Sequence, residues 1–494
     1  MISGAAYATG AMLRAASEGA GRRRLRSGRH VRGVARLNIP DMIVDLLPLF
    51  MFVVLMALVF TSYPIAFVLG GTAVLFGLIG IAFDVFSFIE FFNFVPRVWT
   101  VADNLQIIAV PLFVFMGVML ERSRIAQDLL EALQLVLKRA PGGVALAVVL
   151  MGVIFAAITG VVGASVIMLT LIALPTMLKA GYRPSLAVGV IAASSTLGIL
   201  IPPSILLVFL CELLPMSIGY LFAGALVPGL LLALLYLVYI LLYTLAVPDA
   251  GPRPPPDGER TGWPEIRRAL VRGILPPTVL IALVMGSVLT GVVTITESAA
   301  VGAGGALLLA LTRGGLTLAG LGDCLRRSTM VIGMIFFLYM GATAFAYVFR
   351  VLGGDDVVHA FMGASDMGPW GILLFAILLI FLMGFFFDVL EILLIAVPLF
   401  GPMIAPLDFG AHIAQPDVIY WFAVLVAVTL QTSFLTPPMG LSLFYIKGVA
   451  PSSVTMRQIY TGIVPFVALQ MLCVAIILAW PQIVVGLPHQ LFDP

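Results

Sequence analysis

The sequence predicts an all-α polytopic membrane protein built from two inverted repeats with re-entrant hairpins and interrupted helices. Of the 494 residues, 62% are hydrophobic and only 10% are charged, whereas soluble domains carry about 25% charged residues. Apolar stretches recur from Leu46 almost to the C-terminus, and about 20 such residues cross a bilayer as a helix. The two hydrophobic halves also repeat one order of proline-containing segments. We expect about 10 to 12 membrane segments.

The form of the apolar stretches favours helices over a β-barrel. The stretch LLLALLYLVYILLYTLAV (Leu230–Val247) is continuous, whereas barrel strands alternate apolar and polar positions over about ten residues. Only helices and closed barrels satisfy their backbone groups in lipid. A helical bundle is therefore expected.

Charge and cysteine usage exclude several classes of function. The net charge of +2 is too small to indicate nucleic-acid binding. The three cysteines, Cys211, Cys324 and Cys473, are far apart in apolar surroundings and match no metal spacing, so we expect small hydrophobic core residues. The sequence contains no HExxH motif, P-loop or dinucleotide fingerprint. It thus predicts neither a transition-metal site nor an organic cofactor.

Residues 1–41 form a basic N-terminal extension that differs from the rest of the chain. Its segment GRRRLRSGRHVRGVAR (Gly21–Arg36) lacks the apolar region of a secretory signal. One interpretation is a cytoplasmic anchor that sets orientation or contacts lipid headgroups. The other is a mis-assigned translation start, because Met42 stands just before the first apolar stretch.

A second polar segment, residues 247–273, separates a first transmembrane half (42–246) from a second one (274–494). This linker is rich in proline and arginine. Its arginines outnumber its acidic residues, which places it on the cytoplasmic side by the positive-inside rule.

The two halves carry matching segments in the same order. In the first half LPTML (Leu174–Leu178) precedes LGILIPPSILLVF (Leu197–Phe209), and in the second VPLFG (Val397–Gly401) precedes SFLTPPMGLSLF (Ser433–Phe444). Paired halves with interrupted helices at corresponding places are typical of transporters built from internal repeats.

The double prolines Pro202-Pro203 and Pro437-Pro438 mark two expected interruptions. Each pair removes backbone donors and leaves carbonyls unpaired, which hydrocarbon does not tolerate unless the break lines a polar cavity or is buried in protein. Carbonyls and nearby hydroxyls suit a monovalent cation such as Na⁺, and half-helix N-termini attract an anionic solute group. Kinked helices without any ligand are the alternative. The nearby hydroxyl groups belong to Ser204, Ser433 and Thr436.

Each half also has an irregular stretch upstream of its double proline, and we expect both to be re-entrant or broken. These are TGVVGAS (Thr159–Ser165) and MGFFFDVLE (Met383–Glu391). Glycines in the first stretch allow close backbone approach, and Thr159 and Ser165 can supply oxygen. Close helix packing alone would explain the same pattern.

Acidic residues within apolar stretches are candidates for the substrate pathway, together with Ser204. Asp388 and Glu391 share one helical face, and an acid at membrane depth is by default a functional hypothesis. Glu297 in TITESAA carries the same expectation, ahead of Glu212. For each of them, an interfacial acid at the end of a span is the alternative.

At these segments the chain resembles the large membrane subunit of tripartite ATP-independent periplasmic (TRAP) transporters, within the wider ion-transporter superfamily. The resemblance covers about Leu46 to Pro481 and is specific because several segments occur in the same order. The segments are PLFVFMGVML (Pro111–Leu120), LPTMLKAGY (Leu174–Tyr182), SSTLGILIPPSILL (Ser194–Leu207), SIGYLFAGALVPGLL (Ser217–Leu231), TITESAAVGA (Thr294–Ala303) and LTPPMG (Leu435–Gly440).

The resemblance implies a permease of the bacterial inner membrane that acts by symport, driven by a sodium gradient. Its partners would be a small membrane subunit and a periplasmic solute-binding protein. By resemblance, the cation-binding residues would be Thr159, Gly163, Ser165, Gly198, Ile201 and Pro202 at one site, and Gly384, Ser433, Thr436 and Met439 at the other.

The sequence departs from many relatives in two places. Gly160-Val161-Val162 stands where many have GSS, so backbone carbonyls must contribute more there. The segments GFFFDVLEILLIAVP and LQTSFLTPPMGLSLFYIKGVAP look like a variant group associated with 2-oxoacids and lactate-like acids. A monocarboxylate is therefore the first expectation for the solute.

Three rival functions are weighed against this interpretation. A stand-alone organic anion carrier of the same superfamily would need no partner proteins. An intramembrane enzyme using Asp388 and Glu391 lacks an accompanying nucleophile or metal motif. A channel lacks a filter-like repeat or charged ring. We expect a carrier and no enzymatic activity.

Overall fold

The computed structural model describes residues 39–61, 63–159, 162–252, 262–313, 316–357, 367–437 and 440–492. Throughout these ranges the regular structure is helical, without a β-strand. The chain divides into two units, Met1–Leu47 and Pro48–Pro494, and the architecture below is that of the second unit. Most of the N-terminal extension and part of the linker lie outside the described residues, so their predicted roles stay predictions.

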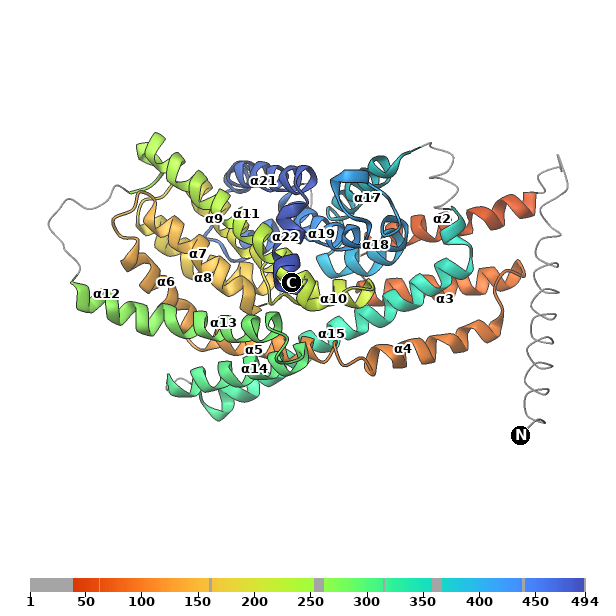
Figure 1. The fold of residues 1–494 in the computed structure, drawn as a ribbon, viewed down its shortest axis with the longest axis horizontal. Coiled ribbons are helices and arrows are strands. Elements are labelled where there is room, and N and C mark those ends of the chain that lie inside the picture. Colours follow the sequence, from red (N-terminus) through yellow and green to blue (C-terminus); the bar gives the residue numbers. More distant parts are fainter. Residues whose placement is uncertain are drawn as a thin grey trace. The chain divides into compact units, whose positions relative to one another are not determined.

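The helices alternate with short connections in both halves of the chain (Figure 1). In the first half they are α2 (Ile39–Val59), α3 (Ile65–Ala82), α4 (Phe94–Ala102), α5 (Ala109–Arg122), α6 (Ile125–Val136), α7 (Gly143–Thr159), α8 (Val162–Lys179), α9 (Pro184–Thr196), α10 (Ile205–Leu213) and α11 (Ile218–Ala246). In the second half they are α12 (Trp263–Ala269), α13 (Leu275–Leu289), α14 (Ile295–Thr312), α15 (Leu318–Val351), α17 (Pro369–Met383), α18 (Val389–Ile404), α19 (Val418–Leu435), α20 (Leu441–Val449), α21 (Met456–Ala479) and α22 (Gln482–Phe492).

The lengths of these helices confirm a polytopic membrane fold with interrupted segments. Within the described ranges, 8 helices are long and apolar enough to cross a membrane. The members of the pairs α7–α8 and α17–α18 are connected by only a few residues. Helices α7, α17 and α18 belong to the shorter apolar helices, whereas α8, with 18 residues, is one of the 8. Arms such as α17, with 15 residues, fall short of the roughly 20 residues that a full crossing needs. They form the hairpins that the sequence predicts.

The element order occurs twice, which confirms the predicted repeat. A hairpin (α7–α8) is followed by an interrupted helix (α9–α10), and a second hairpin (α17–α18) is followed by a second interrupted helix (α19–α20). The inversion of the second copy relative to the first stays a prediction.

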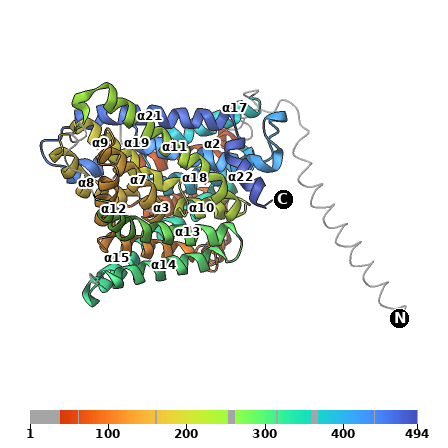
Figure 2. The same ribbon diagram turned by 60° about the vertical axis from the view of Figure 1, so that its left-hand side comes forward.

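Glycines allow several helix pairs to pack at backbone contact. A Cβ at Gly189 of α9 would lie 2.1 Å from the carbonyl oxygen of Gly462 in α21, and one at Gly341 of α15 would lie 2.6 Å from that of Ala66 in α3. Small residues at such crossings are the usual means of helix association in lipid. Figures 1 and 2 likewise show α13 beside α14.

Helix α19 forms the centre of the C-terminal half. All of its residues except Tyr420 are buried, because α17, α18, α11 and α21 surround it (Figure 1). The indole Nε1 of Trp421 donates a hydrogen bond to the carbonyl oxygen of Ile477 in α21 over 2.9 Å. The second interruption therefore follows a helix that is held on most sides by protein.

The three cysteines are buried and unpaired, in line with the expectation of small hydrophobic core residues. Among the described residues, no group of three or more His, Cys, Asp or Glu side chains is arranged to hold a metal ion.

Candidate functional site

The first interrupted helix breaks where the sequence predicts. Helix α9 ends at Thr196, a 3-10 turn covers Leu197–Ile199, and α10 begins at Ile205. The peptide bond between Pro202 and Pro203 is cis. The Ser204 hydroxyl donates to the carbonyl oxygen of Ile199 over 3.1 Å, which closes the break with a local hydrogen bond.

The second interrupted helix breaks at the corresponding place. Helix α19 ends at Leu435 and α20 begins at Leu441. Thr436 Oγ1 donates to the carbonyl oxygen of Thr432 over 2.7 Å, and Ser433 Oγ donates to that of Leu430 over 2.9 Å. Because a hydroxyl that donates keeps its acceptor lone pairs, both oxygens can still coordinate a cation. Met439 lies outside the described residues, so its predicted role stays a prediction.

The tips of the two hairpins are short, and only the second lies fully within the described residues. Between α7 and α8, Gly160, Val161 and the Thr159 side chain lie outside the described residues. In the second hairpin, α17 ends before Gly384 and α18 begins at Val389. Asp388 Oδ1 accepts a hydrogen bond from the backbone N–H of Val389 over 2.7 Å. Glu391 Oε2 accepts one from the N–H of Asp388 over 2.8 Å.

One cavity of about 110 Å³ lies where these breaks and tips meet. Four predicted site residues line it: Gly163, Gly198, Ser204 and Asp388. They come from α8, the turn after α9, the start of α10 and the start of α18, so both repeats contribute. The remaining lining residues are Val162, Ile199, Leu206, Val331, Met334, Ile335, Val389, Leu390 and Tyr445.

Three helix N-termini converge on this cavity. The lining includes the first residues of α8 and α18, Val162 and Val389, and Ser204, the residue before α10. Helix N-termini carry unpaired N–H groups and partial positive charge, which favour a bound anion. No Lys or Arg is among the described lining residues. An anionic group here would be held by backbone dipoles.

The Asp388 carboxylate does not cancel the partial positive charge of all three helix N-termini, because it caps only its own helix, α18. A capping box satisfies the N-terminus of α18 through Asp388 and Glu391. Helices α8 and α10 have no comparable acidic cap among the lining residues. Their N-termini are therefore the stronger candidates for an anionic solute group.

Gly163 packs closely against the ring of Tyr445. A Cβ at Gly163 would lie 3.1 Å from the Cζ atom of the Tyr445 ring, tighter than an ordinary contact. The absence of a side chain lets α20 of the second repeat approach α8 of the first. This contact places a phenol in the wall of the cavity.

The residues predicted to bind the second cation are brought together. A Cβ at Gly384 would lie 1.9 Å from Ser433 Oγ, so the hairpin tip and the end of α19 are in direct contact. Thr436 follows one turn later.

At the first break, Ser165 and Ile201 are buried, each with 4% of its surface exposed, and Ile201 packs against Gly229 of α11. Pro202 is buried as well.

Two of the predicted pathway acids are placed elsewhere. Glu297 lies at the exposed start of α14, where its Oε2 accepts from the backbone N–H of Thr294 over 2.7 Å in a capping box. It does not line the cavity, and its predicted role in the pathway stays a prediction. Glu391 also caps a helix and is not among the lining residues. Glu212, the lower-ranked acid, accepts a hydrogen bond from Asn104 over 2.6 Å.

Sequence reasoning missed Tyr445 and the wall supplied by α15. The aromatic follows Leu441, the first residue of α20, by one helical turn, a spacing that could have indicated the same face. Val331, Met334 and Ile335 carry the 3- and 4-residue spacing of any buried helix face, so nothing local marks them as lining a cavity.

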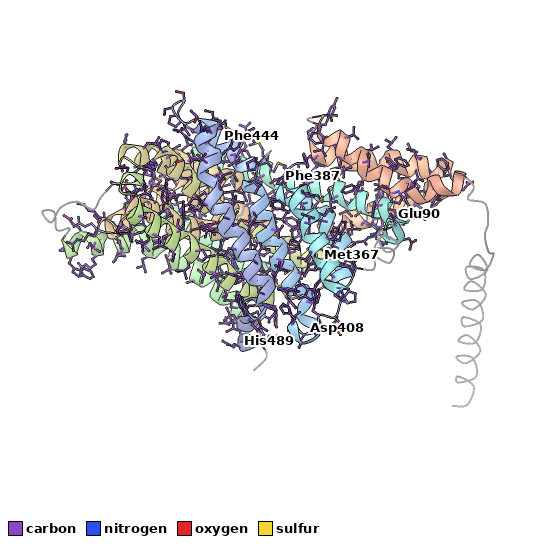
Figure 3. The ribbon with its side chains drawn as sticks, turned by 90° about the horizontal axis from the view of Figure 1, so that it is seen from above. Glu90, Met367, Phe387, Asp408, Phe444 and His489 are labelled. Carbon is purple, nitrogen blue, oxygen red and sulfur yellow. The ribbon has the colours of Figure 1, made fainter. Side chains whose placement is uncertain are left out.

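Figure 3 labels Phe387 and Phe444, which directly precede Asp388 and Tyr445 in the sequence, in the upper half of the view. His489 and Asp408 lie toward the opposite edge.

A bundle in which two hairpins and two interrupted helices from sequence repeats enclose one cavity has the architecture of a secondary transporter. The chain belongs to the tripartite ATP-independent periplasmic transporter family, as its DctM component, and the family match covers residues 52–483. It is thus a multi-pass permease of the bacterial inner membrane and not an enzyme. Membership implies a small membrane subunit and a periplasmic binding protein as partners.

Individual relatives agree with this assignment. The C4-dicarboxylate TRAP transporter large permease protein DctM of Pseudomonas aeruginosa is 28% identical over 398 residues, covering 80% of this chain and 89% of that protein. The ectoine/5-hydroxyectoine TRAP transporter large permease protein UehC of Ruegeria pomeroyi is 28% identical over 392 residues, covering 78% and 87%.

A solved structure shares the fold. The YdaH transporter of Alcanivorax borkumensis, described as having an unusual topology, superposes with a TM-score of 0.55. The match covers 77% of this chain and 85% of that one at 14% sequence identity. The arrangement of helices is therefore similar although the sequences have diverged.

Proposed function

We propose that this permease carries out sodium-coupled uptake of a small organic acid, a monocarboxylate or 2-oxoacid, delivered by a periplasmic binding protein. The observation that carries the proposal is the convergence of three helix N-termini on one cavity without a basic side chain among its described lining residues. Backbone dipoles can hold one carboxylate. The relatives named for C4-dicarboxylates and ectoine also handle small carboxylate-bearing solutes by their names.

The size of the cavity supports a small solute. Its volume of about 110 Å³ is smaller than that of an engineered cavity of about 150 Å³ that binds one benzene molecule. A three-carbon acid satisfies this limit better than a sugar acid does. Tyr445 and Ser204 supply hydroxyl groups that can orient the solute once its carboxylate is bound.

Sodium coupling is supported by the oxygen atoms around each break. Ser433 and Thr436 present hydroxyl oxygens at the second break, where Ser433 contacts the hairpin tip at Gly384, and hard cations prefer oxygen ligands. Cation and solute would then share the same mobile elements. To couple the fluxes, sodium must favour the state that binds the solute, because equal affinity for all states shifts nothing.

Uptake into proteoliposomes tests the proposal. The liposomes would contain this chain with its small membrane subunit, and the binding protein would be loaded with radiolabelled pyruvate. We expect uptake with an inward sodium gradient and none with an equal potassium gradient. Omitting the binding protein should abolish uptake.

Each contrary outcome has a separate meaning. Equal uptake in sodium and potassium would refute sodium coupling. Uptake without the binding protein would establish a stand-alone organic anion carrier. Uptake of succinate but not pyruvate would refute the monocarboxylate assignment. Ser123→Ala is a matched control for Ser204→Ala, because Ser123 Oγ also donates to a backbone carbonyl, that of Leu120, but does not line the cavity.

A further inference from the structure

A second, larger cavity lies apart from the solute cavity and is entirely apolar. Its volume is about 390 Å³, and it shares no lining residue with the solute cavity. Four helices or their connections contribute aliphatic and aromatic side chains, among them Leu49 and Phe52 from α2, Phe349 from α15, Phe375 and Leu379 from α17, and Phe400 from α18.

Water does not fill such a space. Buried water needs two to four polar partners, and an engineered apolar cavity of about 150 Å³ stays dry and binds a hydrocarbon. No polar atom lines this cavity. One of its lining residues, Leu49, is 51% exposed, so the wall of the cavity reaches the surface of this membrane protein. Hydrocarbon from the bilayer is the chemically matched occupant.

A polar mouth adjoins the apolar cavity. A smaller hollow shares Phe52, Phe349, Ile395 and Leu399 with it. Its wall adds Arg350, the penultimate residue of α15, and Asp355, which follows that helix. A guanidinium and a carboxylate thus stand at one end of an apolar chamber.

The guanidinium is held in place over this mouth. Arg350 Nη2 donates to the carbonyl oxygen of Pro398 in α18 over 3.3 Å. Residue 402, four positions later in α18, is also a proline and has no N–H to donate, which leaves the Pro398 carbonyl oxygen available. An arginine has five N–H donors, and a planar fork of two of them matches a phosphate. Asp355 is exposed beside it and suits an ammonium group.

From these features we propose that the chain binds one zwitterionic phospholipid of the phosphatidylethanolamine type. One acyl chain occupies the cavity between α2, α15 and the α17–α18 hairpin. The lipid phosphate contacts Arg350 and the ammonium group contacts Asp355. Anionic phosphatidylglycerol satisfies only the arginine, and an uncharged glycolipid satisfies neither residue.

The position of this lipid site connects it with the second hairpin. Met383 lines the apolar cavity and directly precedes Gly384, whose backbone contacts Ser433. The acyl chain therefore packs against both arms of the second hairpin. The inference does not depend on which solute is transported.

Native mass spectrometry of the delipidated full-length protein, purified with any co-extracted partner, tests the proposal by titration with three lipids. The probes are phosphatidylethanolamine, phosphatidylglycerol and a glucosyl diacylglycerol with identical acyl chains. We expect one tight phosphatidylethanolamine site, with weaker binding of the other two. Ala396→Phe, which fills the cavity, should lower the affinity by about tenfold or more.

Headgroup variants separate the two polar contacts. Arg350→Gln should lower phosphatidylethanolamine affinity by about tenfold, and Asp355→Asn should remove the preference over phosphatidylglycerol. Leu308→Phe is the matched control, because Leu308 is 61% exposed on α14 and lines neither cavity. Circular dichroism melting of each variant separates lost binding from lost folding, and Arg350→Gln tests the site if Ala396→Phe does not fold.

Three results would overturn the proposal. One is equal retention of all three lipids by the parent protein. Another is unchanged affinity in folded Ala396→Phe or Arg350→Gln. The third is loss of the small membrane subunit, without loss of lipid, in Ala396→Phe, which would assign the cavity to a partner helix.

Discussion

Gln431 of α19 donates a hydrogen bond from Nε2 to Thr196 Oγ1 at the end of α9 over 3.2 Å. The two residues are separated by 235 positions in the sequence, and both side chains are fully buried. Thr196 is the last residue of α9, and Gln431 lies one turn before Leu435, the last residue of α19. This hydrogen bond therefore joins the two helices that precede the breaks.

Removing either partner of this hydrogen bond should lower the free energy of unfolding, and the effects of the two substitutions should not be additive. Thr196→Val and Gln431→Leu each delete one partner, and the double variant deletes both. Because a buried polar group without its partner is unfavourable, we expect each single change to destabilise by about 1–3 kcal/mol. The double variant should be less destabilised than the sum, with a coupling of about 0.5–1.5 kcal/mol. Unfolding in mixed micelles measures the cycle, and strict additivity would show that the two side chains act independently.

The contact of Gly384 with Ser433 should tolerate no side chain. Gly384→Ala places a Cβ 1.9 Å from Ser433 Oγ and 2.2 Å from Ser433 Cβ, so the hairpin tip has to move away from α19. Overpacking of this kind costs about 1–3 kcal/mol, and we expect a lower melting temperature and a loss of uptake. Ser433→Gly in the same chain should restore stability in part.

Gly448→Ala provides the control for this experiment. Gly448 lies in α20, and nothing stands within 4 Å of the position that its Cβ would take. If Gly384→Ala melts and transports like Gly448→Ala, the close packing of the hairpin tip against α19 is wrong.

The two roles of Asp388 can be separated by substitution. Asp388→Asn keeps a side-chain acceptor for the N–H of Val389 but removes the charge from the cavity, whereas Asp388→Ala removes both. We expect Asp388→Ala to lose about 1 kcal/mol of stability through the missing cap and Asp388→Asn to lose little. Both variants should change uptake because both remove the negative charge of Asp388 from the cavity. Normal uptake by Asp388→Asn would show that the carboxylate serves only as a cap.

Thr436 should report on sodium more than on folding. Thr436→Ala removes a hydroxyl oxygen beside the second break, and we expect the sodium concentration for half-maximal uptake to rise by about tenfold, the effect of losing one ligand worth about 1.4 kcal/mol. Thr436→Ser keeps the oxygen and should behave like the parent.

Thr343→Ala is the matched control for Thr436→Ala. Thr343 Oγ1 also donates to the carbonyl oxygen four residues earlier, over 2.8 Å, but it lies in α15 and does not line the solute cavity. Sodium activation unchanged in Thr436→Ala, or equally weakened in Thr343→Ala, would contradict a coordinating role for Thr436.

The breaks were predictable from the sequence because proline acts locally. Pro202 and Pro203 stop a helix whatever surrounds them, and the structure interrupts α9–α10 there. Likewise Gly163 and Asp388 stood out as small or charged residues in apolar surroundings, and Gly198 was predicted through the family resemblance; all of them line the cavity.

The rest of the site depends on contacts between distant segments. Tyr445 enters the cavity only because Gly163, in the other half of the chain, leaves room for its ring. The capping role of Glu297 was missed because a capping box and a site acid look alike in one sequence, and its predicted role in the pathway stays a prediction. Its partner Thr294, three residues earlier, was the signal for a cap.

The shortness of the hairpin arms has a consequence for biosynthesis. Helices α17 and α18 have 15 and 16 residues, below the roughly 20 that a segment needs to be stable alone in a bilayer. During translation these arms wait for α19, which in turn reaches its Trp421 contact only after Ile477 of α21 has been synthesised. The second half therefore completes its assembly from its C-terminal end. If a ribosome stalls between α19 and α21, the hairpin of the nascent chain can pack only against an α19 that lacks its Trp421 contact.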